Sequence, residues 1–145
     1  MNNDSFAAAW GPRMLAVLRI VTALIFLEHG TQKILGFPPP TGPTPPVFSL
    51  FWVGGFIEMI GGLLLLVGFL TRPVAFVLAG EMAVAYWMVH APQSFFPALN
   101  GGDAAILYCF VFLYLAVVGP GAWSIDTSRR RSGAAPAAND RLRST

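Results

Sequence analysis

The chain has 145 residues, of which 55% are hydrophobic and only 11% are charged. Soluble domains carry about 25% charged residues, so this composition indicates a one-domain membrane protein. The formal charge of +2 does not indicate a nucleic-acid partner, because the basic residues stand at the ends of apolar runs and in the C-terminal tail.

The pattern of apolar runs predicts an all-α protein, an integral-membrane four-helix bundle. An N-terminal cytoplasmic segment is expected at 1–12, a membrane domain at 13–123 and a disordered basic cytoplasmic tail at 124–145. The four spans are expected at about 13–35, 48–70, 74–91 and 103–123. A membrane helix needs about 20 residues to cross a hydrocarbon core of ~30 Å. Asp103 is expected to cap the last span, and Gly119 to close it.

The connections between the spans predict the orientation in the membrane. The basic residues that fall on one side of a four-span chain are Arg13, Arg72, Arg129, Arg130, Arg131, Arg141 and Arg143. The two opposite loops, 36–47 and 92–102, contain no lysine or arginine, and the first of them is proline-rich. The positive-inside rule therefore places both termini in the cytoplasm.

The first span is unusual because it carries five polar or ionisable residues inside an apolar run. These residues are Arg19, Glu28, His29, Gln32 and Lys33. An ionisable group at membrane depth costs about 2.5–3.5 kcal/mol on insertion scales, so it is normally paired and turned toward the bundle interior. This span therefore needs partners on the neighbouring helices.

The later spans offer Glu58 and Glu81 as such partners. We expect Arg19 to be neutralised by one or both glutamates in a buried polar network. A stripe of glycines surrounds Glu58 in the second span, at Gly54, Gly61 and Gly68, and we expect it to let the first span come close.

A second cluster, Glu28, His29 and Lys33, is expected in the outer half of the bundle, and we interpret it as a candidate proton or quinone site. The alternative is a polar network that only fixes helix packing. His90 is expected at a span end, as a solvated or capping residue. Haem ligation by His29 and His90 is disfavoured, a di-metal centre more so, and no metal site is predicted. Catalytic residues are not identified by the sequence.

The only cysteine is Cys109, in the middle of the last span. A single cysteine excludes an intrachain disulfide, a CxxC redox pair and a cysteine-ligated iron–sulfur cluster. We interpret it as a small buried hydrophobic residue. The chain also has no flavin or nucleotide fingerprint, so electrons for any redox reaction would have to come from a partner protein.

Short motifs in all four spans resemble the DoxX family of small bacterial inner-membrane proteins. They are R-x8-E-H-G-x2-K over Arg19–Lys33, GFIEMIGGLLLLVGFLTR around Glu58, the glutamate at Glu81, and NGGDAAILYCFVFLYLAVVGPGAWSID from Asn100. The resemblance covers about residues 13–126. It implies a four-helix membrane bundle linked to redox systems, including thiosulfate–quinone oxidoreduction and protection against oxidative or thiol stress.

From the residues and this resemblance we expect a multi-pass protein of the bacterial inner membrane, a subunit of a redox or oxidative-stress system. Quinone is the candidate cofactor. The expected partners are the lipid bilayer and a redox protein, with a homo-oligomer as a further alternative. Two other functions stay open: a non-catalytic scaffold or assembly factor, and a small transporter, although no inverted repeat favours the latter.

Overall fold

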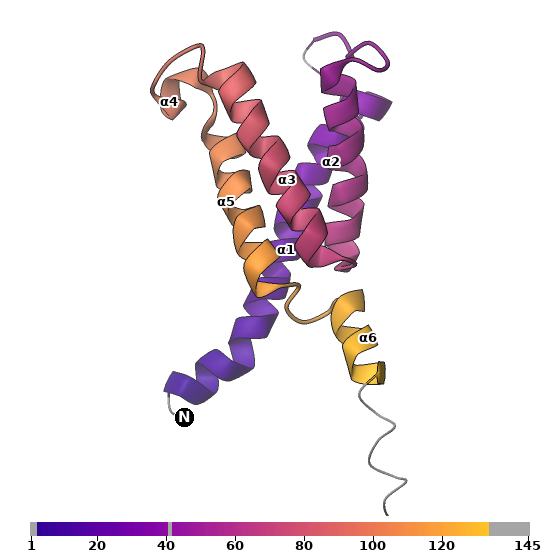
Figure 1. Cartoon of the computed structure of the whole chain (residues 1–145), viewed down its shortest axis with the longest axis vertical. Coiled ribbons are helices and arrows are strands. Elements are labelled where there is room, and N and C mark those ends of the chain that lie inside the picture. The colour runs from indigo at the N-terminus through magenta and orange to yellow at the C-terminus, as the bar shows by residue number, and fades with distance from the viewer. Residues whose placement is uncertain (1–2, 41, 134–145) are drawn as a thin grey trace, which may run out of the picture.

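The computed structural model describes residues 3–40 and 42–133, and all regular secondary structure within these ranges is helical (Figure 1). The all-α fold is therefore confirmed. The helices are α1 (Asn3–Leu35), α2 (Leu50–Val67), α3 (Thr71–Ala85), the π-helical turn η1 (Tyr86–His90), α4 (Pro97–Asn100), α5 (Asp103–Val118) and α6 (Ile125–Gly133).

The long helices are arranged as two pairs. Helix α1 packs against α2, and α3 packs against α5, whereas α2 and α3 touch over a smaller region. The pairs meet near the end that carries the N-terminus and α6, and they diverge toward the opposite end (Figure 1). The buried core is mostly aliphatic, and within it the rings of Phe26 and Phe112 are in edge contact, with centroids 4.8 Å apart. Cys109 packs against this core, half-buried.

The ends of α2 follow local sequence signals. Ser49 precedes the helix and its hydroxyl accepts a hydrogen bond from the backbone N–H of Trp52 at 3.3 Å. Gly68 ends the helix in the left-handed conformation, with φ at +66°. The span is thus a few residues shorter at each end than the expected 48–70.

One expectation for the last span needs correction. Asp103 is the first residue of α5, and the residue that precedes the helix is Gly102, so Asp103 does not cap it. The helix ends at Val118 because Gly119, the residue expected to close it, takes a φ of +98° that helical residues do not adopt. Residues 119–123, counted in the expected span, lie outside the helix.

Both ends of the chain are more helical than their composition predicts. Helix α1 begins at Asn3 and continues through Pro12, which is exposed, so the carbonyl that proline leaves without a helical donor can face water. The predicted disordered tail begins with an ordered helix, α6, whose residues are fixed by contacts described below. The rest of that tail, 134–145, lies outside the described residues.

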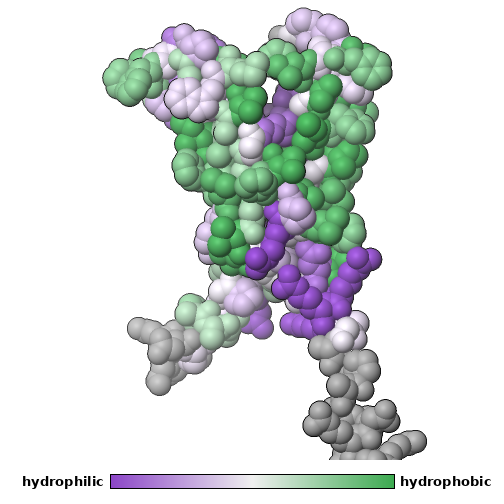
Figure 2. Space-filling view, viewed as in Figure 1, coloured by the Kyte–Doolittle hydropathy of each residue, from purple (hydrophilic) through white to green (hydrophobic). Residues whose placement is uncertain are grey.

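Three helical segments are long and apolar enough to cross a membrane: Ser5–Leu35, Leu50–Val67 and Thr71–His90. Helix α5 is apolar but has only 16 residues. Large hydrophobic side chains cover the outside of the helices (Figure 2), as expected for a surface that faces lipid. The count of four spans and the cytoplasmic location of both termini remain predictions.

Candidate functional site

Glycines on both helices bring α1 and α2 into close contact in the half of the bundle away from α6. A Cβ atom on Gly30 would lie 2.5 Å from the backbone nitrogen of Met59, and one on Gly55 would lie 2.6 Å from Cβ of Lys33. Only residues without a side chain allow two helix backbones this close. The approach places Lys33 of α1 beside Glu58 of α2.

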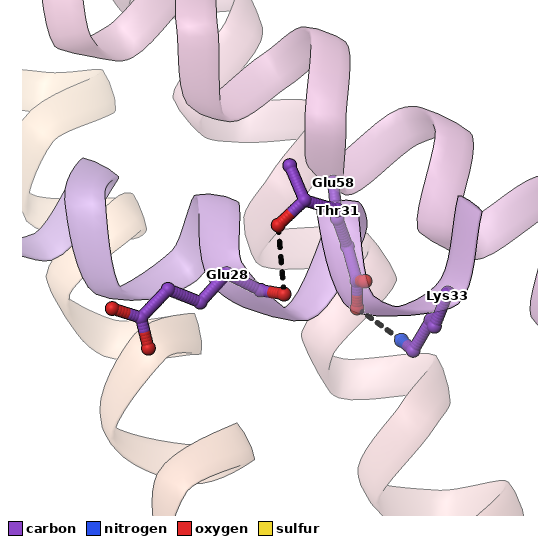
Figure 3. A network of polar contacts seen from close by, with 4 residues as sticks. All are labelled: Glu28, Thr31, Lys33 and Glu58. Atoms are coloured by element: carbon purple, nitrogen blue, oxygen red, sulfur yellow. Dashed lines mark hydrogen bonds and ion pairs between the residues drawn. The ribbon is translucent and has the colours of Figure 1, made fainter. Parts of the chain in front are cut away.

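Lys33 and Glu58 form an ion pair across this contact, with Nζ 2.6 Å from Oε1 (Figure 3). The Glu58 side chain is 5% exposed and that of Lys33 is 31% exposed. The second oxygen of Glu58 is buried and has no hydrogen-bond partner among the described residues. The pair therefore neutralises the carboxylate but leaves part of its hydrogen-bonding capacity unused.

Glu81 projects from α3 toward the same place. A Cβ atom on Gly54 would lie 3.2 Å from Oε1 of Glu81, so this carboxyl group lies against the backbone of α2. Both of its oxygens are buried, and neither has a hydrogen-bond partner in the described part of the chain. A buried polar group without a partner costs about 1–3 kcal/mol, so this residue calls for a ligand, a water molecule or a proton.

A cavity of about 340 Å³ joins these groups. Its polar lining consists of Lys33, Glu58 and Glu81, and the rest is apolar, including Leu50, Phe51 and Met88. Leu50, Phe51 and Met88 are also largely exposed on the outside of the helices, so the apolar part of the cavity adjoins the lipid-facing surface.

A second cavity of about 300 Å³ lies on the other side of the ion pair. It too is lined by Lys33 and Glu58, and it adds His29, His90 and Tyr108. The rings of His29 and Tyr108 meet edge to face, with centroids 6.1 Å apart. The Lys33–Glu58 pair thus stands in the wall shared by the two cavities.

His90 belongs to the π-helical turn that ends α3. Its Nδ1 lies 2.9 Å from the carbonyl oxygen of Asn100, which can only accept, so Nδ1 carries the proton. Nε2 is then an acceptor in the neutral ring. Of the two expected roles, the structure shows the capping one, because His90 binds the carbonyl of Asn100 at the end of α4. The side chain is not fully solvated, since it is half-buried and lines a cavity.

The predicted cluster of Glu28, His29 and Lys33 does not stay together. The Glu28 side chain is exposed and points away from Lys33 and Glu58 (Figure 3). His29 and Lys33 line the second cavity together. Tyr108 was not singled out in the sequence, although it stands four residues before the buried Phe112 and so faces the same interior.

The predicted pairing of Arg19 with Glu58 or Glu81 is wrong. Arg19 is fully buried, and its guanidinium group donates to five backbone carbonyls at 2.7–3.4 Å. The acceptors are Leu65 and Leu66 at the end of α2 and Pro120, Ala122 and Trp123 after α5. Leu65 and Leu66 stand in the last turn of α2, where carbonyls lack a full set of intrahelical donors, although the carbonyl of Leu65 also accepts from the backbone N–H of Gly68. Pro120, Ala122 and Trp123 belong to the irregular segment between α5 and α6. Arg19 therefore ties α1, α2 and the segment after α5 together.

The glycine stripe also faces a different neighbour from the one expected. A Cβ atom on Gly61 would lie 2.7 Å from a methyl group of Leu78 on α3, so Gly54 and Gly61 admit α3. The contact with α1 uses Gly62, where a Cβ would lie 3.3 Å from Leu27, together with Gly55. Glu58 stands between the two glycine rows and can face both neighbours.

The arrangement can hold a small polar group and exchange a proton with it. One ammonium and two carboxyl groups meet at an apolar cavity, and two imidazoles lie behind them. Among the described residues, no three His, Cys, Asp or Glu side chains come close enough to hold a metal ion.

The comparisons with known proteins give the family but no reaction. An uncharacterised protein of Haemophilus influenzae is 45% identical over 120 residues, which cover 79% of this chain and 90% of the relative. The inner membrane protein YqjF of Escherichia coli is 33% identical and covers 76% of this chain and 87% of its own. An uncharacterised membrane protein of Mycobacterium tuberculosis is 29% identical over 92% of this chain. No solved structure matches.

These relatives and the three apolar helices make the chain a multi-pass protein of the inner membrane. The DoxX family model matches residues 14–91, from the start of the first apolar run to the end of η1. The chain belongs to the DoxX family.

Proposed function

We propose that this protein is an integral-membrane subunit of a redox or oxidative-stress system, and that the cavities beside Lys33–Glu58 hold a quinone or pass a proton. The observation that carries the proposal is the carboxyl group of Glu81, which is buried beside an ion pair and has no hydrogen-bond partner among the residues that the structure describes. Ionisable groups inside the membrane mark ligand sites or proton paths.

A quinone headgroup matches the chemistry of the first cavity. The ammonium group of Lys33 can donate to a quinone carbonyl, and the carboxylate of Glu81 can accept from a quinol hydroxyl. The apolar ring and tail would lie among Leu50, Phe51 and Met88, where the cavity adjoins the lipid-facing surface. A ligand dissolved in the bilayer would then reach the site from the side, between α2 and α3.

Charge balance supports a role for a proton. Lys33 carries one positive charge, and Glu58 and Glu81 carry two negative charges when both are ionised. One bound proton cancels the difference, so a proton held among these three groups leaves the site neutral. His29 and His90 line the cavity behind the pair and supply imidazole nitrogens that can accept or donate a proton.

The scaffold function is the second candidate, and Arg19 favours it. The guanidinium group of this residue donates to backbone carbonyls at the end of the bundle opposite to the cavities, and these hydrogen bonds hold separate segments together. The two candidate functions rest on different parts of the molecule. Arg19 stabilises one end of the bundle, and Glu81 and its neighbours form a candidate site at the other end.

Rescue of an oxidant-sensitive deletion strain separates the two candidates. Glu81→Gln and His29→Gln keep size and hydrogen bonding nearly constant while they remove the titrating groups. We expect both variants to be folded and inserted but to fail to rescue. Glu28→Gln is the matched control, because Glu28 is exposed and lines neither cavity. Full rescue by all three folded variants would favour the scaffold.

A further inference from the structure

Helix α6 is fixed to the turn between α2 and α3 by a single carboxylate. Oδ1 of Asp126 accepts from the backbone N–H of Leu70, and Oδ2 accepts from that of Thr71, both at 2.9 Å. The backbone N–H of Asp126 donates to the carbonyl of Gly68 at 3.0 Å. Asp126 therefore caps the start of α3 and holds α6 in one position.

This docking brings arginines from two distant parts of the chain together. Arg129 and Arg130 of α6 and Arg72 of α3 line a hollow of about 200 Å³ with Leu70 and Pro73. The guanidinium carbon of Arg129 lies 4.9 Å from the centre of the Phe69 ring, which fixes this side chain. Arg72 donates to the carbonyl of Val118 at 3.4 Å.

The hollow carries an excess of positive charge. It contains three guanidinium groups and one carboxylate, and that carboxylate is already bound to two backbone N–H groups. Among the side chains described, those of 5–40 and 42–133, no carboxylate lies within 4.0 Å of any of the three arginines. Figure 2 shows the hydrophilic surface that gathers over α6 and the adjoining helix ends.

The hollow lies where the membrane-crossing part of the molecule ends. Thr71, in its lining, is the first residue of the apolar segment Thr71–His90. Leu70, also in the lining, is about half exposed, as is Val67 one turn before it. A ligand at this point meets arginines on one side and apolar side chains on the other.

We propose that Arg72, Arg129 and Arg130 bind the phosphate group of an anionic phospholipid, whose acyl chains lie along the adjacent apolar helix surface. Guanidinium groups bind phosphate oxygens through paired hydrogen bonds, which suits the diester of a lipid headgroup. The apolar lining at Leu70 favours a lipid over a free phosphate ion. A bound lipid would bridge α3 and α6 and add to the hold that Asp126 provides.

Native mass spectrometry of the full-length protein in detergent tests this proposal. Phosphatidylglycerol and phosphatidylcholine with the same acyl chains are titrated against the wild type and the Arg72→Gln/Arg130→Gln double variant. A basic residue at a membrane surface changes the affinity for anionic lipid about fivefold, so the double variant should bind phosphatidylglycerol about 25-fold more weakly. Phosphatidylcholine has the same phosphate but a cationic choline beside it, so it should bind the wild type more weakly and should lose less affinity in the double variant.

Arg131→Gln is the matched control, since Arg131 is exposed on the same helix and does not line the hollow. This variant should bind phosphatidylglycerol with an affinity within about twofold of the wild type. A charge outside the hollow attracts the bound phosphate only over a longer distance, and salt screens that attraction. An equal loss in this control would overturn the proposal in favour of a diffuse surface attraction. If the double variant is not helical, Arg130→Gln alone should show the fivefold loss.

A separate arm distinguishes lipid from free phosphate. Phosphatidylglycerol should raise the melting temperature of the detergent-solubilised protein, and inorganic phosphate without lipid should not. Equal stabilisation by inorganic phosphate, lost in Arg130→Gln, would assign the hollow to a free anion and contradict the proposed lipid.

Discussion

The ammonium group of Lys33 lies 2.6 Å from Oε1 of Glu58, and it approaches from a helix whose backbone is held close by glycines. A lysine in the first membrane helix is thus paired with a nearly buried carboxylate of the second. The neighbouring Glu81 has no such partner in the described part of the chain.

The ion pair predicts strong coupling between two substitutions. Lys33→Met leaves a buried charge without its partner, and such losses cost about 3–5 kcal/mol when the pair is fully buried, so less is expected for the partly exposed Lys33. The double variant Lys33→Met/Glu58→Gln should be at least about 1 kcal/mol more stable than the sum of the single effects implies. The unfolding free energies of the wild type, the two single variants and the double variant, measured in mixed detergent, give the coupling energy. Simple additivity would mean that the pair contributes nothing.

The close contact of α1 and α2 makes Gly30 intolerant of any side chain. Gly30→Ala places a methyl group 2.5 Å from a backbone nitrogen and should cost about 1–3 kcal/mol through overpacking. Gly80→Ala is the control, because a Cβ there meets nothing within 4 Å. That variant should be neutral or slightly stabilising, since alanine favours a helix over glycine. Equal melting temperatures for both variants would place the helices further apart.

Arg19 should behave as a structural tie with no electrostatic link to Glu58. Arg19→Met removes a donor from five backbone carbonyls, of which that of Leu65 keeps the N–H of Gly68. It should lower the unfolding free energy by several kcal/mol, given about 1–3 kcal/mol for each buried group left unpaired. Arg19→Lys should recover only part of the loss, because one ammonium cannot span acceptors on both sides. Combined with Glu58→Gln, either change should be additive, and a coupling above about 0.5 kcal/mol would contradict the geometry.

The docking of α6 should survive mild acid. Burial acts to raise the pKa of Asp126, but hydrogen bonds from Thr71 and Leu70, with the charge of Arg130, outweigh it and hold the pKa below its usual value. A lowered folded-state pKa contributes stability above the unfolded value of about 3.9 and loses it as the pH falls through the folded value. The melting-temperature gap between wild type and Asp126→Ala should stay constant from about pH 7 to 5 and close below about 4. A gap that closes above pH 5 would contradict this.

The sequence correctly predicts that Arg19 and Glu58 lie inside the bundle, but it does not predict which residues they meet. The contacts Gly30–Met59, Leu27–Gly62 and Lys33–Gly55 set the register of α1 against α2. In that register Glu58 of α2 lies beside Gly30 of α1. Gly30 is eleven residues after Arg19, which is about 16 Å along the helix axis at 1.5 Å per residue. Helical periodicity gives the face of each residue but neither this offset nor the rotation of one helix against another.

The partners of Arg19 show a second limit. Every acceptor is a main-chain carbonyl, a group that all residues share, so no side-chain pattern could mark Leu65 or Trp123 as partners. The glycines and prolines at 119–121 do predict a break after the last span, and it is this break that frees the carbonyl of Pro120. Composition predicts disorder from residue 124 onward, whereas hydrogen bonds from the start of α3 to Asp126 hold 125–133 as helix α6.

The central claim is that the cavity beside Lys33, Glu58 and Glu81 binds a quinone, and mapping with a photoreactive ubiquinone analogue tests it most directly. The labelled protein is digested and the attachment sites are identified by mass spectrometry. We predict labels on Leu50, Phe51 or Met88 that excess unlabelled quinone suppresses and that Glu81→Gln reduces. Labels spread evenly over lipid-facing side chains such as Leu107 and Phe110, unaffected by competitor, would contradict the claim.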